Sequence, residues 1–132
     1  MKKISILLLL TCLFLKANAQ ETGLGLTEGE IKSLFDMYSF TPGYSDGQKF
    51  IATTLDYGQF YYFFDAKGIC IFCTYVPNST KDLSDAVSIY NQTCIILDKT
   101  HWKEIIKGKT YFISLITSNG YTFFKYSSTY LN

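Results

Sequence analysis

The segment FYYFFDAKGICIFCTYV, residues 60–76, decides the fold of this chain. Two runs of aromatic and β-branched residues flank the turn sequence Asp65-Ala66-Lys67-Gly68. Asp is favoured at the first position of a β-turn, and Gly at the last, where the backbone often takes a positive φ. The segment therefore predicts a β-hairpin.

Both faces of this hairpin are apolar. Phe60, Tyr62 and Phe64 would point to one side of its first strand, and Tyr61 and Phe63 to the other. A hairpin covered on only one face would alternate apolar and polar residues. We therefore expect the hairpin to run through the middle of a sheet with something packed on each side, or to offer one face to a partner.

Residues 1–19 have the pattern of a secretory signal peptide. A positive start at Lys2 and Lys3 precedes an apolar core at residues 4–15 and the small-x-small site Ala17-Asn18-Ala19. The apolar core is shorter than the about 20 residues that a membrane-spanning helix needs. We therefore expect residues 1–19 to be removed, residues 20–132 to form a single domain, and the protein to be periplasmic or extracellular.

The charge composition argues against nucleic-acid binding. The chain contains no Arg, and loss of the signal peptide leaves a small excess of acidic residues. Nucleic-acid recognition normally leaves a basic patch, with Arg for bidentate contacts. The lysines form no polybasic run that would favour anionic membranes.

The remaining elements follow from periodicity and turn residues. Residues 28–37 predict a helix that begins with a capping box at Thr27 and Glu30. A second helical stripe runs from Leu83 to Tyr90, with Ser79 or Thr80 as its cap. Further strands are expected at residues 49–55, 94–97, 109–117 and 121–126, while residues 100–107 fit either a helix or a strand. The predicted fold class is α+β, with two helices packed on a largely antiparallel sheet of about five to six strands, in the order helix–meander–helix–strands.

The two halves of the chain echo each other. Ile51 precedes Gly58 by the same spacing as Ile113 precedes Gly120, and an aromatic-rich strand follows each glycine. This pattern fits two helix-then-meander halves, and it fits two unrelated hairpins equally well.

Four features carry a resemblance: the sequence GICIFCTYVP at residues 68–77, a helix that ends in YNQT, the lone Trp102, and the sequence NGYTFFKY at residues 119–126. In these the chain resembles small exported proteins of Gram-negative bacteria that have no assigned activity. In element order alone it is also similar to type III secretion chaperones. Those chaperones are cytoplasmic, whereas this chain carries an export signal, so the resemblance does not imply their function.

The cysteines and the histidine do not form a recognisable redox or catalytic motif. Cys12 leaves with the signal peptide, so Cys70, Cys73 and Cys94 remain. Residues three apart in a regular strand point to opposite faces, which argues against a Cys70–Cys73 bond unless the strand bulges. A disulfide of Cys94 with Cys70 or Cys73 is the candidate bond. His101 is the only histidine, and no motif places a nucleophile or an acid beside it.

The most unusual feature of the composition is its high aromatic content, with eleven Tyr, eleven Phe and one Trp. Aromatic platforms bind sugars or proteins. We therefore expect a non-catalytic binding module with an unknown protein or glycan partner in the envelope, no cofactor, and no catalytic or metal-binding residues; a homodimer is compatible with the sequence. The alternative is a small hydrolase that acts on envelope polysaccharide or peptide. The candidate binding aromatics are Tyr57, Tyr61, Tyr62, Tyr121 and Tyr126.

Overall fold

The computed structural model describes residues 23–130. The predicted signal peptide and its cleavage site lie outside the described residues. The elements, in chain order, are α2 (Glu28–Leu34), β1 (Thr41–Ser45), β2 (Gln48–Leu55), β3 (Gly58–Phe64), β4 (Cys70–Pro77), α3 (Thr80–Thr93), β5 (Ile95–Asp98), β6 (His101–Ile106), β7 (Lys109–Ser118) and β8 (Tyr121–Ser127).

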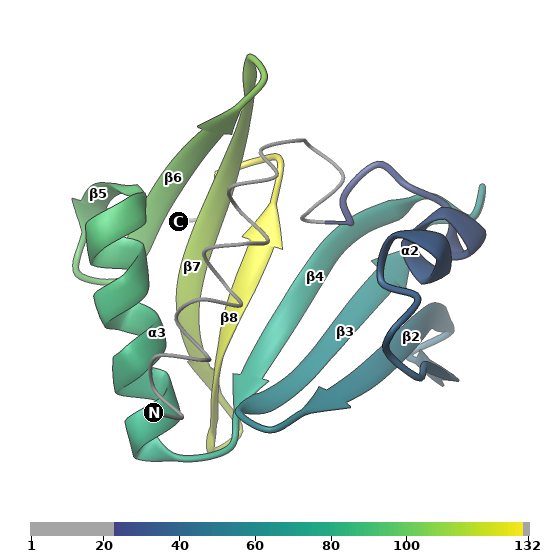
Figure 1. Ribbon diagram of the computed structural model, residues 1–132, viewed down its shortest axis with the longest axis horizontal. Coiled ribbons are helices and arrows are strands. Elements are labelled where there is room, and N and C mark those ends of the chain that lie inside the picture. Colours follow the sequence, from purple (N-terminus) through teal and green to yellow (C-terminus); the bar gives the residue numbers. More distant parts are fainter. Residues whose placement is uncertain (1–22, 131–132) are drawn as a thin grey trace.

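All the strands belong to one antiparallel sheet with the order β1-β2-β3-β4-β8-β7-β6-β5. The chain forms a helix followed by a four-stranded meander, and then does so again. The last strands of the two meanders, β4 and β8, pair at the centre of the sheet. Both helices lie on the same face of the sheet (Figure 1). We call this the helix face and the opposite side the open face.

The predicted strand count of five to six is wrong, because the sheet has eight strands. The stretch around Pro42 and Gly43, where no strand was predicted, forms the edge strand β1. Proline is tolerated at a sheet edge, where no partner needs its missing N–H. The ambiguous stretch at residues 100–107 contains strand β6, in which Trp102 and Ile106 both turn a buried side chain to the helix face.

Two unpredicted hairpin turns, β1–β2 and β6–β7, explain the additional strands. The pairs Asp46-Gly47, Lys107-Gly108 and Asn119-Gly120 each have two successive positive φ angles, between 50° and 81°. This is the backbone of a two-residue type I′ turn, whose twist matches that of the flanking strands. Only the Asn119-Gly120 turn was predicted. Asp46-Gly47 was an equally good signal for the β1–β2 hairpin.

The central hairpin is confirmed. Strands β3 and β4 pair with each other inside the sheet. The Asp65 carboxylate accepts hydrogen bonds from the backbone N–H groups of Lys67 and Ile69, at 2.9 and 3.0 Å. Gly68 has φ +80°. The residues of the turn therefore stabilise it themselves, through the Asp65 side chain and the positive φ of Gly68.

The chain does consist of two helix-then-meander halves, but the similar spacing in the sequence matched turns that do not correspond in the two halves. The echo matches the β2–β3 turn before Gly58 with the β7–β8 turn before Gly120. In the sheet, β2 corresponds to β6 and β3 to β7, so the counterpart of the β7–β8 turn is the β3–β4 turn at Gly68.

Both helices begin as their caps predict. Thr27 and Glu30 form the capping box of α2, and the Ser79 hydroxyl accepts the Asp82 N–H at 3.1 Å to cap α3. Helix α2 ends at Leu34 rather than at the predicted Met37. Phe35 leaves the helical conformation, with φ −115° and ψ 50°, and its ring packs on Tyr62 of β3.

The core lies between the helices and the sheet. Its largest fully buried side chains include Trp102, Tyr75, Tyr90 and Phe124. The rings of Tyr75, Tyr90 and Trp102 all lie within 6.1 Å of the Phe124 ring, centre to centre. The Trp102 indole N–H donates to the Asn91 side-chain oxygen at 2.8 Å, which ties β6 to the end of α3.

Candidate functional site

The open face of the sheet carries a long, aromatic-lined hollow of about 780 Å³. We call it the aromatic trough. Seven of its sixteen lining residues are aromatic. Its lining consists of Tyr44, Ser45, Asp46, Gln48, Phe50, Tyr61, Phe63, Phe72, Thr74, Val76, Ile116, Ser118, Asn119, Tyr121, Phe123 and Lys125.

Strand register builds the floor of the trough. Phe50 of β2 lies opposite Phe63 of β3, and Phe63 lies opposite Phe72 of β4. The Phe63 and Phe72 rings stack with their centres 4.5 Å apart, and the Phe50 and Phe63 rings are 5.4 Å apart. The result is a continuous strip of rings across three strands, all half-buried.

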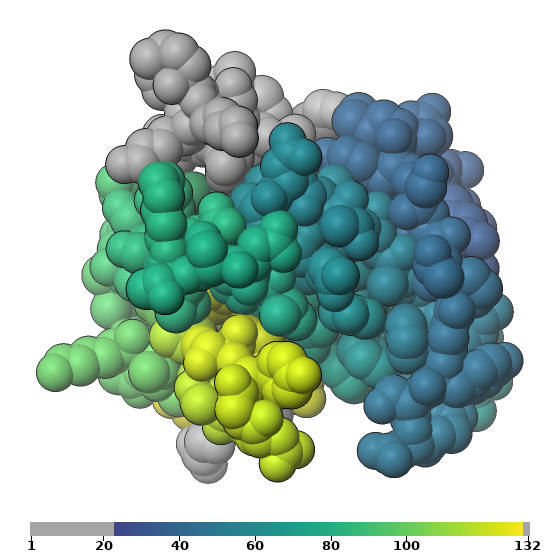
Figure 2. Space-filling view, turned by 90° about the horizontal axis from the view of Figure 1, so that it is seen from below, coloured from purple at the N-terminus to yellow at the C-terminus, as the bar shows by residue number. Residues whose placement is uncertain are grey.

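Two hairpin ends rise beside this floor. The β1–β2 hairpin supplies Tyr44, Asp46 and Gln48, and the β7–β8 hairpin supplies Ser118 and Tyr121. Figure 2 shows a notch between blue atoms of the β1–β2 region and yellow atoms near the end of the chain. The trough is therefore a concavity of the twisted sheet, open along its length.

Charge is sparse in the trough. Asp46 and Lys125 are the charged residues of its lining. The Lys125 ammonium lies over the Phe72 ring, 4.1 Å from the ring centre. The Tyr61 hydroxyl donates to the Gln59 side-chain oxygen at 2.6 Å. The floor is thus apolar, with hydroxyl and amide groups around its rim.

The five candidate tyrosines divide between the two faces. Tyr61 and Tyr121 line the trough. Tyr57, Tyr62 and Tyr126 are buried in the core on the helix face. Sequence reasoning missed five aromatic residues of the trough: Tyr44, Phe50, Phe63, Phe72 and Phe123. The period-two alternation of the strands could have grouped these residues with Tyr61, but it could not show which face the helices cover.

The structure places the ends of the candidate disulfide, Cys94 on one side and Cys70 or Cys73 on the other, on well-separated parts of the sheet. Cys94 precedes edge strand β5, which lies four strands away from β4. At about 4.8 Å per strand this separation is roughly 19 Å, far beyond the reach of a disulfide.

The Cys70-x-x-Cys73 motif shows an irregularity that the prediction allowed for. The β3–β4 register shifts so that Phe63 faces Phe72 while Phe64 faces Cys70, and the bulge turns both cysteines into the core. Burial raises the pKa of Cys70 to about 12 and that of Cys73 well above its ordinary value. Both are protonated at neutral pH, which makes them poor nucleophiles and poor metal ligands.

His101 has an acidic neighbour that the sequence did not reveal. Its Nδ1 lies 2.8 Å from an Asp98 carboxylate oxygen, and its ring lies 5.3 Å from the Tyr130 ring. The backbone N–H of Thr100 and then His101 hold the pKa of Asp98 below its ordinary value. Ser114 lies opposite His101 in the β6–β7 register, but it is only 2 % exposed, and no hydrogen bond joins the two side chains. A nucleophilic serine needs solvent access and a hydrogen bond to its base, and Ser114 has neither. The hydrogen bonds of Asp98 to Thr100 and His101 stabilise the β5–β6 turn.

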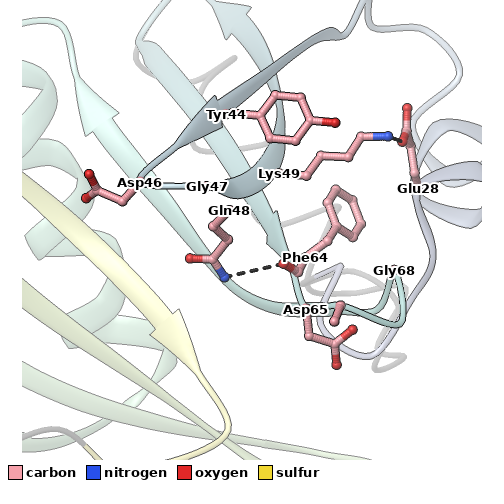
Figure 3. A pocket seen from close by; sticks show the side chains of 10 residues that line it. Glu28, Tyr44, Asp46, Gly47, Gln48, Lys49, Phe64, Asp65 and Gly68 are labelled. Carbon is pink, nitrogen blue, oxygen red and sulfur yellow. Dashed lines mark hydrogen bonds and ion pairs between the residues drawn. The ribbon is translucent and has the colours of Figure 1, made fainter.

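A second hollow, of about 540 Å³, lies where α2 meets the β1–β2 hairpin and the β3–β4 turn. Figure 3 shows the Lys49 ammonium pointing to the Glu28 carboxylate, 2.6 Å away. Lys32 also pairs with Glu28, at 2.7 Å. The two lysines hold the pKa of Glu28 below its ordinary value. Because two ammonium groups surround this one carboxylate, Glu28 presents no uncompensated negative charge to a ligand.

Glu104 on β6 is a partly buried acid, and burial raises its pKa. In the folded protein its charged form is penalised, so its contribution to stability falls as pH rises from below the ordinary carboxyl pKa, about 4.3, through the raised value. We expect Glu104→Gln to raise the melting temperature at neutral pH and to have little effect at a pH well below 4.3. Thermal unfolding at both pH values tests this, with the exposed acid Asp36→Asn as the charge-matched control. Equal shifts for the two variants would contradict a burial effect.

Among residues 23–130, no group of three or more His, Cys, Asp or Glu side chains could hold a metal ion. No helix in the described part of the chain is long and apolar enough to cross a membrane. Comparison of the chain with protein families, with curated proteins and with solved structures found no match in any of the three.

Proposed function

We propose that this protein is an exported, non-catalytic binding module whose recognition surface is the aromatic trough. The observation that carries the proposal is the strip of half-buried rings at Phe50, Phe63 and Phe72 on the open face of the sheet. Rings left in this state gain further burial when a partner covers them, at about 25 cal/mol per Å² of apolar surface.

The composition of the trough favours an apolar segment of a protein partner. Protein interfaces are enriched in aromatic residues at their centre, depleted of charge there, and rimmed by polar groups. The trough has this anatomy, with seven aromatic residues and one residue of each charge sign. A glycan needs polar partners for its many hydroxyl groups, and over the Phe63–Phe72 floor the Lys125 ammonium is the polar group that lies against a ring.

Replacing trough aromatics is expected to remove binding. Peptides selected from a random phage-displayed library on immobilised residues 20–132 should be rich in aromatic and aliphatic residues. Tyr61→Ala and Phe123→Ala should each lower the affinity for the selected peptides about 30-fold. This corresponds to a loss of about 2 kcal/mol of binding free energy, which is typical of a central aromatic contact. Titration by fluorescence anisotropy measures this loss, and circular dichroism verifies that each variant is folded.

His101→Ala is the control, because His101 lies outside the trough lining and should leave peptide affinity unchanged. A glycan array probed in parallel separates the two kinds of partner. Peptides that bind Tyr61→Ala and wild type equally, or binding to glycans alone, would refute the proposal. Loss of biological activity in a folded His101→Ala variant would favour the hydrolase instead.

A further inference from the structure

Strand β5 forms one edge of the sheet and exposes three consecutive aliphatic side chains. Ile95, Ile96 and Leu97 are 49 %, 54 % and 39 % exposed. Ile105 on the neighbouring strand β6 is 57 % exposed. An apolar edge strand with free backbone groups is a template for pairing with another strand, and proteins normally blunt such edges.

The backbone of β5 has its free groups at a definite position. The Leu115 N–H donates to the Thr100 carbonyl at 2.8 Å, so Trp102 and Ile113 form a hydrogen-bonded pair and the backbone groups of Trp102 point to β7. Ile96 lies opposite Trp102 on the other side of β6. The N–H and C=O of Ile96 therefore point away from β6, to the free edge.

The opposite edge of the sheet is protected. Strand β1 contains Pro42 and Gly43, and Pro42 has no N–H to offer a further strand. Proline on an edge strand is a common device against edge-to-edge pairing. Strand β5, with the sequence IILD, contains no proline or glycine, and its one irregularity is a register shift against β6 between Ile96 and Asp98. The two edges therefore differ in what they permit, and β5 is the one suited to pairing.

We propose that two copies of this protein dimerise through β5, paired antiparallel about a two-fold axis at Ile96. The two Ile96 residues would exchange both of their backbone hydrogen bonds. Ile95 and Leu97 of the two copies would flank this pair, so aliphatic side chains meet along the seam. The pairing would end at Asp98 of one copy and Cys94 of the other, because Thr93 belongs to helix α3. No like charges oppose each other, and this self-complementarity favours a second copy over a foreign strand.

The dimer would leave the trough accessible. The trough involves β1–β4, β7 and β8, and neither β5 nor β6 contributes to its lining. A two-fold axis between antiparallel edge strands runs perpendicular to the sheet, so both open faces would look to the same side. Two troughs on one side would bind a repeated partner more tightly than a single trough does.

The first test is the oligomeric state of the mature chain and of Ile96→Pro. Proline at this position removes the outward N–H without breaking a bond to β6, so the domain is expected to fold. Sedimentation equilibrium over a dilution series should show a dimer for wild type and a monomer for Ile96→Pro. The circular dichroism spectra should agree. A wild-type protein that is monomeric throughout the series would overturn the proposal.

The second test needs no disruptive variant. In a Cys94→Ser background, Ile96→Cys places two thiols at the two-fold axis, where paired Cα atoms lie about 5.5 Å apart, within disulfide range. Thr41→Cys, exposed on the opposite edge strand, is the matched control. Ile96→Cys should form covalent dimers under mild oxidation much faster than Thr41→Cys. Equal rates would overturn the interface. Neither test depends on trough binding, so failure here leaves the proposed function standing, and the reverse also holds.

Discussion

Phe124→Ala is expected to lower the free energy of unfolding by about 3–5 kcal/mol, the usual loss for a buried phenylalanine. Phe124 is fully buried on the central strand β8 and contacts the rings of Tyr75, Tyr90 and Trp102. Its removal leaves a cavity whose walls belong to three other elements, so the site cannot collapse easily. The loss approaches the whole stability of a small domain, about 5–15 kcal/mol.

The adjacent residue provides the control. Phe123 has the same side chain and lies on the same strand, but it points to the open face and is only half-buried. Phe123→Ala should cost about 1 kcal/mol or less, in line with substitutions outside the core. Urea unfolding at low temperature measures both variants. Losses of similar size would mean that the two faces of the sheet are equally covered, contrary to the structure.

Gly58→Ala is expected to cost about 3 kcal/mol, at the upper end for overpacked sites. Gly58 begins β3, and an added methyl group would collide with the Tyr75 ring and with the backbone carbonyl of Val76. The carbonyl belongs to the β3–β4 pairing and cannot move away without breaking it. Tyr75 is also held in place, since its hydroxyl donates to the Tyr57 carbonyl at 2.9 Å.

In helix α2, a glycine-to-alanine substitution should stabilise the protein rather than destabilise it. Gly29 lies inside that helix, and an added methyl group would meet no atom within 4 Å. Gly29→Ala is therefore expected to stabilise the domain by about 0.5–1 kcal/mol, because glycine loses more backbone entropy in a helix than alanine does. Chemical denaturation of both variants is the measurement. A neutral Gly58→Ala would show that β3 and β4 approach each other less closely than the structure indicates.

The sequence did not determine which faces of the central hairpin are covered. Its apolar faces were compatible with cover on both sides or with one side offered to a partner. The helices cover only the side of Tyr62 and Phe64, and the side of Tyr61 and Phe63 forms the trough floor. Tyr61 and Tyr62 are chemically identical neighbours, so no local property could have assigned one to the surface and the other to the core.

The sequence by itself determined the features that depend on contacts between near neighbours. The Asp65–Gly68 turn, the capping box at Thr27 and Glu30, and the Ser79 cap are local hydrogen-bond chemistry, legible over a few residues. Strand β1 could also have been found this way, because Asp46-Gly47 specifies a type I′ turn.

Only the tertiary structure decided which distant segments meet. The pairing of β4 with β8 joins the two meanders across more than forty residues of chain, and this pairing separates Cys94 from Cys70 and Cys73. It also brings Lys125 of β8 over Phe72 of β4 and thereby completes the trough. Such pairings arise from the burial of one whole sheet face beneath two helices. Burial is a collective, non-directional driving force, so no single stretch of sequence encodes its outcome.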